Sequence, residues 1–367
     1  MVNSLVLRNV KTVEEKVFDL VIKEKKIVDI ASSGQGIGEE VIDFKQKVYI
    51  SSGWIDMHVH ALPELDPYGD EVDEIGYKLG VTTIVDAGSA GSDNFHKLIN
   101  YSKSAKTNVF AFLNVSKIGL QRIDELSNLT WLDEDALLLT LDKYKDLIVG
   151  LKVRMSKSVV GKNGLEPLKV AKKLSNMTSL PLMVHIGSGP PSIVEILEML
   201  ECNDIITHYL HPKKNNIFDE LGRPLPSFIQ ALNRGVHLDV GHGNASFSFS
   251  TAKQAKDHNI KFNTISTDIY RKNRLQGPVY SMSDTLTKFL YLGYSLKDVI
   301  DAVTVNAAKW LKKPELGRVS VGDVANLTLF SVEDQAIMLK DSTGLEYKCD
   351  KQISVRGVVV NGEYIEC

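Results

Sequence analysis

Short apolar segments alternate with helical patterns through the middle of the chain, and this rhythm limits the possible folds more than any other feature. Stretches of about 10 to 20 residues with helical spacing separate the apolar segments. Eight segments read as strands: 54–60, 82–86, 109–115, 148–153, 181–185, 205–209, 236–240 and 262–268. Eight such units in about 250 residues match an α/β fold of the (β/α)8 TIM barrel type. A doubly wound sheet is disfavoured, because no Gly-x-Gly-x-x-Gly pattern follows any of these segments.

Both ends of the chain carry a different pattern, in which β-branched residues cluster in short runs between charged turns. The runs are 4–10, 17–23, 26–30, 318–330, 352–360 and 363–365. No helical spacing appears there, and an Asn-Gly pair marks a hairpin turn before the last run. We therefore expect residues 1–50 and 316–367 to form one small β-sandwich domain. Residues 51–315 would form the barrel.

The composition excludes several classes of function. Lys and Arg number 43 against 46 Asp and Glu, so no broad basic surface exists to attract nucleic acid or anionic lipid. No apolar run reaches the roughly 18 residues needed to span a bilayer, and we expect a cytoplasmic protein. The three cysteines, Cys202, Cys349 and Cys367, lack Cys-x-x-Cys spacing. Nitrogen and oxygen atoms, rather than thiolates, are therefore expected to hold any metal.

Side chains able to bind metal stand at the ends of the predicted strands, which is the mouth of a barrel. The first strand ends in His58-Val-His60, and the two imidazoles point to the same side because strand side chains alternate. Four other strands end in Lys152, His185, His208 and Asp268. A lone histidine is more often structural than a ligand. Their joint placement at one barrel mouth favours a shared metal site.

These features together resemble the amidohydrolase superfamily of binuclear metal hydrolases, over nearly the whole chain. The resemblance depends on the opening Gly53-x-Ile55-Asp56-x-His58-x-His60, on the four strand-end residues, and on the 322–327 run of the terminal domain. Within the superfamily, the chain looks most like the bacterial amidohydrolase/deacetylase group, often labelled dihydroorotase-like. The supporting segments are 150–154, 185–187, 207–212, 242–247 and 266–270.

The resemblance implies two divalent metal ions, with zinc as the expected metal. It implies that His58, His60 and Asp268 bind the more buried ion and that His185 and His208 bind the more exposed one. A lysine desolvated beside two dications has a depressed pKa, so its neutral amine can capture carbon dioxide. Lys152, carboxylated in this way, would bridge the ions. Asp268 is the implied catalytic residue, a general acid and base serving a metal-bridging hydroxide that attacks an amide or ester.

The residues beyond the ligands suggest a small-molecule substrate with a carboxylate. Arg154, two residues after Lys152, could clamp that carboxylate in bidentate fashion. Tyr270 and Arg271 follow Asp268 and offer a phenol and a cation. His242 and Ser246 lie in a glycine-containing loop after the seventh strand and are further candidates. The habit of the family favours a homo-oligomer.

Departures from sister families narrow the predicted reaction. Dihydroorotases usually carry an Arg shortly after the paired histidines, and adenine deaminases of the superfamily carry a Glu immediately after them. Here Ala61-Leu62-Pro63 follow the pair. The sequence therefore favours a deacetylase acting on a small acylated amino or hydroxy acid. A cyclic amide hydrolase and a deaminase remain alternatives, and a non-catalytic scaffold that kept the barrel is a more distant one.

Overall fold

A computed structural model describes residues 4–367, so the first three residues of the predicted terminal domain lie outside it. Seven neighbouring strands pair in parallel and in chain order, and they form the wall of the barrel. The strands are β6 (Trp54–Val59), β7 (Val81–Ala87), β8 (Asn108–Asn114), β9 (Ile148–Met155), β10 (Leu182–Ile186), β11 (Ile205–Thr207) and β12 (His237–Asp239). Each of the first seven predicted segments overlaps one of these strands.

The eighth predicted segment, 262–268, is irregular, but it closes the barrel between β12 and β6. Two isolated parallel bridges join it to these strands, Asp239 to Thr264 and Val59 to Ile269. The expectation of a regular eighth strand is corrected, because Asp268 has a φ of 52°, in the left-handed region, which interrupts extended backbone. The barrel topology itself is confirmed.

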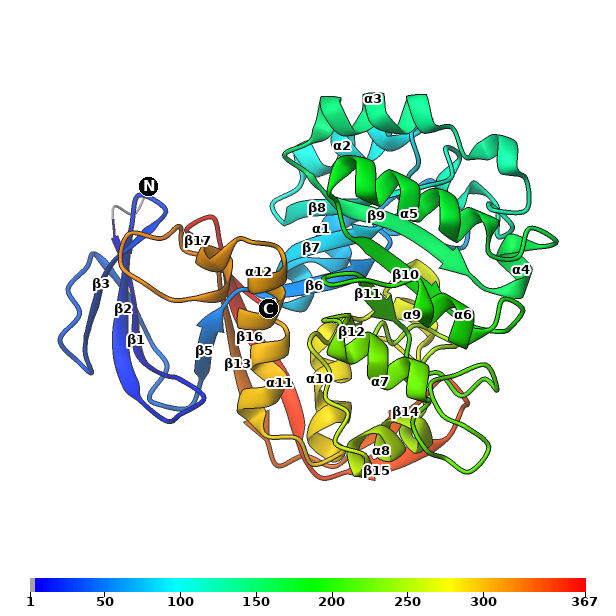
Figure 1. Cartoon of the computed structure of the whole chain (residues 1–367). Helices are drawn as coiled ribbons and strands as arrows, with labels where there is room; N and C mark the ends of the chain where they lie inside the picture. The colour runs from blue at the N-terminus through cyan, green and yellow to red at the C-terminus, as the bar shows by residue number, and fades with distance from the viewer. Residues whose placement is uncertain (1–3) are drawn as a thin grey trace.

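Helices follow the barrel strands, and most of them cover the outside of the sheet (Figure 1). They are α1 (Val72–Ile75), α2 (Phe95–Ser104), α3 (Glu134–Tyr144), α4 (Lys157–Val160), α5 (Glu166–Thr178), α6 (Ile193–Glu198), α7 (Pro226–Asn233), α8 (Phe249–Asp257), α9 (Arg271–Gln276), α10 (Met282–Tyr291), α11 (Leu296–Ala302) and α12 (Val305–Trp310). A separate buried cluster joins side chains of five barrel strands, among them Ile55, Phe112 and Met183, to α12. This apolar plug fills the barrel below its mouth, so the polar side chains at the strand ends have a rigid floor.

Both ends of the chain contribute to one eight-stranded sheet beside the barrel (Figure 1). Its strands are β1 (Ser4–Lys11), β2 (Val17–Lys23), β3 (Lys26–Ser32), β4 (Glu40–Asp43), β5 (Tyr49–Ser52), β13 (Leu327–Glu333), β16 (Gln352–Val360) and β17 (Glu363–Glu366). The antiparallel pairing of β5 with β13 joins the two ends, and a core that includes Leu7, Leu20 and Leu327 holds the sheet together. The exact domain boundaries at 50/51 and 315/316 stay a prediction.

A hairpin near the C-terminus, β14 (Ile337–Lys340) and β15 (Glu346–Cys349), leaves this sheet and packs on the barrel. The Ser342 backbone N–H donates to the Phe247 carbonyl at 3.0 Å, and its hydroxyl donates to the same oxygen. The hairpin therefore supports the loop after β12, which reaches the barrel mouth. Among residues 4–367, no helix has the length and apolar character that crossing a bilayer requires.

Candidate metal centre

The six predicted metal ligands converge at the carboxyl ends of the barrel strands, where they line one pocket of about 170 Å³. They come from β6 and the residue after it, from β9 and β10, from the turn after β11, and from the irregular eighth segment. They are His58, His60, Lys152, His185, His208 and Asp268. Residues up to 210 positions apart thus meet because the carboxyl ends of parallel strands share one face of the barrel.

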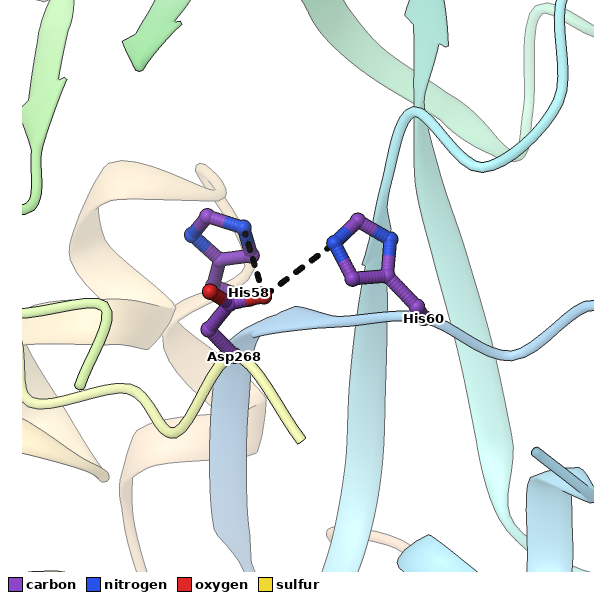
Figure 2. Close-up of side chains that lie close together, drawn as sticks. All are labelled: His58, His60 and Asp268. Carbon is purple, nitrogen blue, oxygen red and sulfur yellow. Dashed lines mark ion pairs between the residues drawn. The ribbon is translucent and has the colours of Figure 1, made fainter. Parts of the chain in front are cut away.

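The tightest group within the pocket consists of His58, His60 and Asp268 (Figure 2). One ligand atom from each residue lies within 4.8 Å of the others. Oδ1 of Asp268 is 3.1 Å from Nε2 of His60 and 3.6 Å from Nε2 of His58. Two imidazoles and a carboxylate at this spacing are the donor set that zinc and similar divalent ions prefer.

Lys152 points into the same group from β9 and is almost completely buried. Its Nζ lies 3.2 Å from Nε2 of His58 and 3.3 Å from the sulfur of Met183. Burial lowers the pKa of Lys152 to about 7, although the nearby Asp268 carboxylate opposes this shift. A substantial fraction of this amine is therefore neutral near pH 7, and a neutral amine is nucleophilic.

His185 and His208 form the other side of the centre. Their ring centroids are 4.4 Å apart, and the ring of His208 lies 5.0 Å from that of His58. Burial, and then the charge of Lys152, holds the pKa of His208 well below its ordinary value, so the ring is neutral. Nδ1 of His208 donates to the Gly241 carbonyl at 2.6 Å, which leaves the lone pair on Nε2. In the described part of the chain this buried Nε2 has no hydrogen-bond partner, as expected of an atom that binds a metal.

Hydrogen bonds on the far nitrogens orient the other two rings. Nδ1 of His58 lies 3.0 Å from the Thr207 hydroxyl, which donates in turn to Asp239 at 2.8 Å. Nδ1 of His60 lies 2.8 Å from the Ser89 hydroxyl. Partners of this kind fix the orientation and tautomer of metal-binding imidazoles. Each ring therefore presents Nε2 to the centre of the group.

The backbone at two of these residues adopts the left-handed region, with φ of 75° at His208 and 52° at Asp268. Such a conformation costs roughly 1–2 kcal/mol for a residue with a side chain. Neighbouring glycines leave space for the side chains of these two residues. A Cβ on Gly243 would lie 2.4 Å from Oδ2 of Asp268, and a Cβ on Gly241 would lie 2.7 Å from Nδ1 of His208. Strain held by tight packing is typical of functional sites.

The charge of Asp268 is maintained by its neighbours. Burial by itself raises the pKa of this carboxyl group, but the adjacent His58 and His60 and the charge of Lys152 outweigh burial. The pKa of Asp268 is consequently lowered from its ordinary value of 3.8. The carboxylate is ionised at neutral pH, as a metal ligand and a proton acceptor must be.

Three of the five predicted substrate contacts line the pocket: Arg154, Ser246 and Tyr270. The guanidinium of Arg154 is already engaged, since its NH1 group donates to both carboxylate oxygens of buried Glu125 at 3.1 and 3.2 Å. Tyr270 is buried and packs edge-on against Tyr68 at 5.2 Å between ring centroids. Substrate contact by these three residues stays a prediction.

Two predicted contacts lie outside the pocket and are corrected. His242 is fully buried below the loop surface, where its ring stacks on Phe247 and its Nε2 lies 3.0 Å from Nζ of Lys288. Arg271 is not among the residues that line the pocket, and it pairs with Asp70 at 3.7 Å. The glycine-rich loop turns His242 inward, because Lys288 on α10 offers a buried partner that sequence spacing does not show.

Three residues of the site were not predicted from the sequence: Tyr68 and Lys213, which line the pocket, and Glu125, which holds Arg154. All three lie in loops after barrel strands, where neither apolar periodicity nor motif spacing marks them. Lys213 offered the one usable signal, because it follows His208 by only five residues.

Comparison with known proteins, like the geometry of the site, relates the chain to metal-dependent hydrolases. The chain is 39% identical over 361 residues to a curated deacetylase of Enterococcus faecalis, and the match covers 98% of each protein. The chain belongs to the amidohydrolase superfamily. A crystal structure described as an adenine deaminase matches this amidohydrolase with a TM-score of 0.95 and 38% identity over 99% of each chain. One described as a dihydroorotase matches with a TM-score of 0.92 and 32% identity over 99% of this chain and 98% of the other.

No protein-family model matches the amidohydrolase chain. The full-length matches to the deacetylase and to two solved structures nevertheless confirm both the barrel and the superfamily. The protein is a hydrolase of the metal-dependent kind found in this superfamily. The substrate that it cleaves depends on the side chains that line the pocket.

Proposed function

We propose that this protein is a metal-dependent deacetylase that removes the acyl group from a small amino or hydroxy acid. The observation that carries the proposal is the convergence of four imidazoles, Lys152 and Asp268 in one pocket of about 170 Å³. That volume suits a small molecule rather than a polymer. The deacetylase of Enterococcus faecalis, which is similar over nearly its whole length, supports the same reaction.

The donor set fits two divalent cations. One cation would be held by His58, His60 and Asp268. The other would be held by His185 and His208, and a carboxylated Lys152 would bind both cations. When bound, the cations would supply Lewis acidity, which lowers the pKa of water and polarises a carbonyl. The absence of thiolates from the group favours zinc, manganese, cobalt or iron, with zinc as the expected metal.

The chemistry of Lys152 follows from its burial. The lone pair of its neutral amine attacks the carbon of carbon dioxide, one N–C bond forms, and the amine loses a proton to solvent. The product is a carbamate with two oxygen atoms and one negative charge. Nζ of Lys152 lies 3.2 Å from Nε2 of His58. A buried ammonium at this position would repel metal cations, whereas a carbamate would attract them. The carbamate would also remove the cost of an unpaired, buried positive charge.

Asp268 is placed to carry the proton of the reaction. Its Oδ1 faces the two histidines of β6, while Oδ2 lies on the side of Gly243. One oxygen is therefore available to take a proton from the attacking water and to deliver it to the leaving nitrogen or oxygen. The depressed pKa of Asp268 keeps this carboxylate in its basic form until the reaction begins.

Other members of the superfamily suggest a cyclic amide hydrolase or a deaminase as the second candidate, since the two solved relatives are described as a dihydroorotase and an adenine deaminase. The residue after the histidine pair argues against both. Ala61 is completely buried, and its backbone N–H donates to Asp86 at 2.8 Å. The stretch Ala61-Leu62-Pro63 therefore contains neither the Arg that is usual in dihydroorotases nor the Glu of the superfamily's adenine deaminases.

A substrate panel with zinc and bicarbonate supplied tests the proposal. The panel contains N-acetyl amino acids, O-acetyl hydroxy acids, dihydroorotate and adenine. We expect acetate release from acetylated acids and about two equivalents of bound metal. Preferred turnover of dihydroorotate or adenine would contradict the deacetylase assignment. Metal content well under one equivalent after purification and loading would favour the scaffold alternative.

The variant Asp268→Asn tests the proton carrier. Asparagine tolerates the left-handed backbone of this position, so the fold should be retained. Turnover should fall roughly 10²- to 10⁴-fold, the usual contribution of general acid–base catalysis. Unchanged turnover would remove Asp268 from this role. A cytoplasmic location and a homo-oligomeric state remain predictions.

A further inference from the structure

Two cationic side chains stand beside the metal centre in the wall of the pocket, and their surroundings differ. Arg154 donates to Glu125, which is fully buried and 3.1 Å away; burial raises the pKa of Glu125 to about 7, although the Arg154 charge opposes this shift. Lys213 comes from the loop after β11 and is half-buried. Across residues 4–367, its ammonium forms neither an ion pair nor a side-chain hydrogen bond. Of these two cations in the pocket wall, Lys213 is the one without an acidic partner among residues 4–367.

The local packing directs this ammonium toward the centre. Gly187, just after β10, has no side chain, and a Cβ there would lie 3.4 Å from Nζ of Lys213 and 3.6 Å from Nε2 of His185. The ammonium thus occupies the space beside His185. The Lys213 backbone N–H donates to Nδ1 of buried His211 at 3.1 Å, which fixes the loop at its base.

The electrostatic surroundings suit an anion. Burial, together with the neighbouring Arg154 charge, lowers the pKa of Lys213, while Asp268 opposes this. Because a neighbouring cation disfavours the charged form of Lys213, a carboxylate bound at this ammonium would stabilise it. Ser156 lies next to Gly187 on the same wall and adds a hydroxyl.

We propose that Lys213 receives the carboxylate of the substrate and sets the preference of the enzyme for acids over their neutral amides and esters. The inference rests on the proposed deacetylase function, which places the scissile carbonyl at the metal centre. Lys213 then binds the opposite end of a short acyl amino or hydroxy acid. Arg154, which the sequence predicts as the carboxylate clamp, is instead held by hydrogen bonds to buried Glu125.

A kinetic comparison of matched substrates tests this assignment. Each acetylated acid that the wild-type enzyme cleaves is compared with its own primary amide, in the wild-type enzyme and in Lys213→Met. The ratio of kcat/KM for acid over amide should fall roughly tenfold or more, mainly through KM, because one charge-assisted hydrogen bond is lost. Lys214→Met is the matched control, since Lys214 is exposed and lies outside the pocket. An acid preference that survives in Lys213→Met would overturn the proposal.

A binding measurement makes the proposal independent of turnover. Metal-loaded Asp268→Asn is titrated calorimetrically with N-acetylglycine and with N-acetylglycinamide, and the titration is repeated with Lys213→Met added. We expect the acid to bind more tightly than the amide, and this difference to shrink roughly tenfold in the double variant. Equal binding of the two probes, or no binding of either, would overturn the role of Lys213. Failure of the deacetylase assignment appears separately, as an absence of acetate release by the wild-type enzyme.

Discussion

The Thr207 hydroxyl connects a buried carboxylate to a proposed metal ligand, so its removal is a direct test of the metal centre. Oγ1 donates to Asp239 at 2.8 Å, and Nδ1 of His58 lies 3.0 Å from it. A hydroxyl has a single proton, so Thr207 accepts from His58 while it donates to Asp239. Nδ1 of His58 therefore carries the proton, and the lone pair lies on Nε2, which faces the centre of the group.

Thr207→Val keeps the shape of the side chain and removes both hydrogen bonds. Asp239 remains satisfied by the hydroxyls of Thr264 at 2.8 Å and Ser266 at 2.6 Å, so we expect the protein to fold. A hydrogen bond within a charged network contributes roughly 1.5–3 kcal/mol. That range corresponds to about 10- to 150-fold in affinity. Loss of an orienting partner typically weakens metal binding by 10- to 100-fold, which agrees with this range.

The assay is a competition between the protein and a chromophoric chelator for zinc, accompanied by thermal unfolding of the metal-free protein. Thr264→Val is the matched control, because it removes another hydroxyl from Asp239 without touching His58. We expect a loss of affinity in Thr207→Val and much less in Thr264→Val. Equal losses in both variants, or unchanged affinity in Thr207→Val, would refute orientation of His58 by Thr207.

Two further perturbations probe the packing and the titration of the barrel. In Gly243→Ala the new Cβ would lie 2.4 Å from Oδ2 of Asp268, so kcat should fall at least roughly tenfold. Gly344→Ala is the control, because Gly344 also has a positive φ but a Cβ there would have no neighbour within 4 Å. This variant should lower only the free energy of unfolding, by about 1 kcal/mol in urea. An equal loss of kcat in both variants would contradict an effect of the new Cβ on Asp268. Burial lowers the pKa of His237 to about 4, so the folded state binds fewer protons than the unfolded chain between about pH 4 and 6.5, and stability falls as pH drops through this window. The free energy of unfolding, measured in urea at several pH values, should fall less steeply with decreasing pH in His237→Gln, by up to about 1.4 kcal/mol per pH unit, and equal slopes would contradict a partly buried, neutral His237.

The fold was largely predictable because its signals are local. Each barrel strand is an apolar run, and the irregular eighth segment still joins its neighbours at Thr264 and Ile269. The His58-x-His60 pair could be recognised for the same reason, because residues two positions apart on a strand have their side chains on the same side. Lys152, His185, His208 and Asp268 could be proposed as partners only because all strand ends of a barrel share one face.

The substrate side of the pocket was less predictable, because it depends on pairs that are distant in the sequence. Arg154 meets Glu125 from a loop 29 residues earlier, and His242 meets Lys288 on a helix 46 residues later. Neither the loop that contains Glu125 nor the loop that contains His242 has a periodicity or a residue spacing that reveals such a partner. The free charge of Lys213 is equally invisible, because it depends on which carboxylates come near it in three dimensions.

The alternation of strands and helices, the sheet built from both chain ends, and the donor groups at the strand ends could all be inferred from the order of the residues. Apolar periodicity and residue type are properties of short segments, and burial of apolar surface selects the fold from them. Which charged side chains find a partner became visible in the folded structure alone. Coulomb energies depend on distance and burial across loops, and these quantities exist only once the chain has folded.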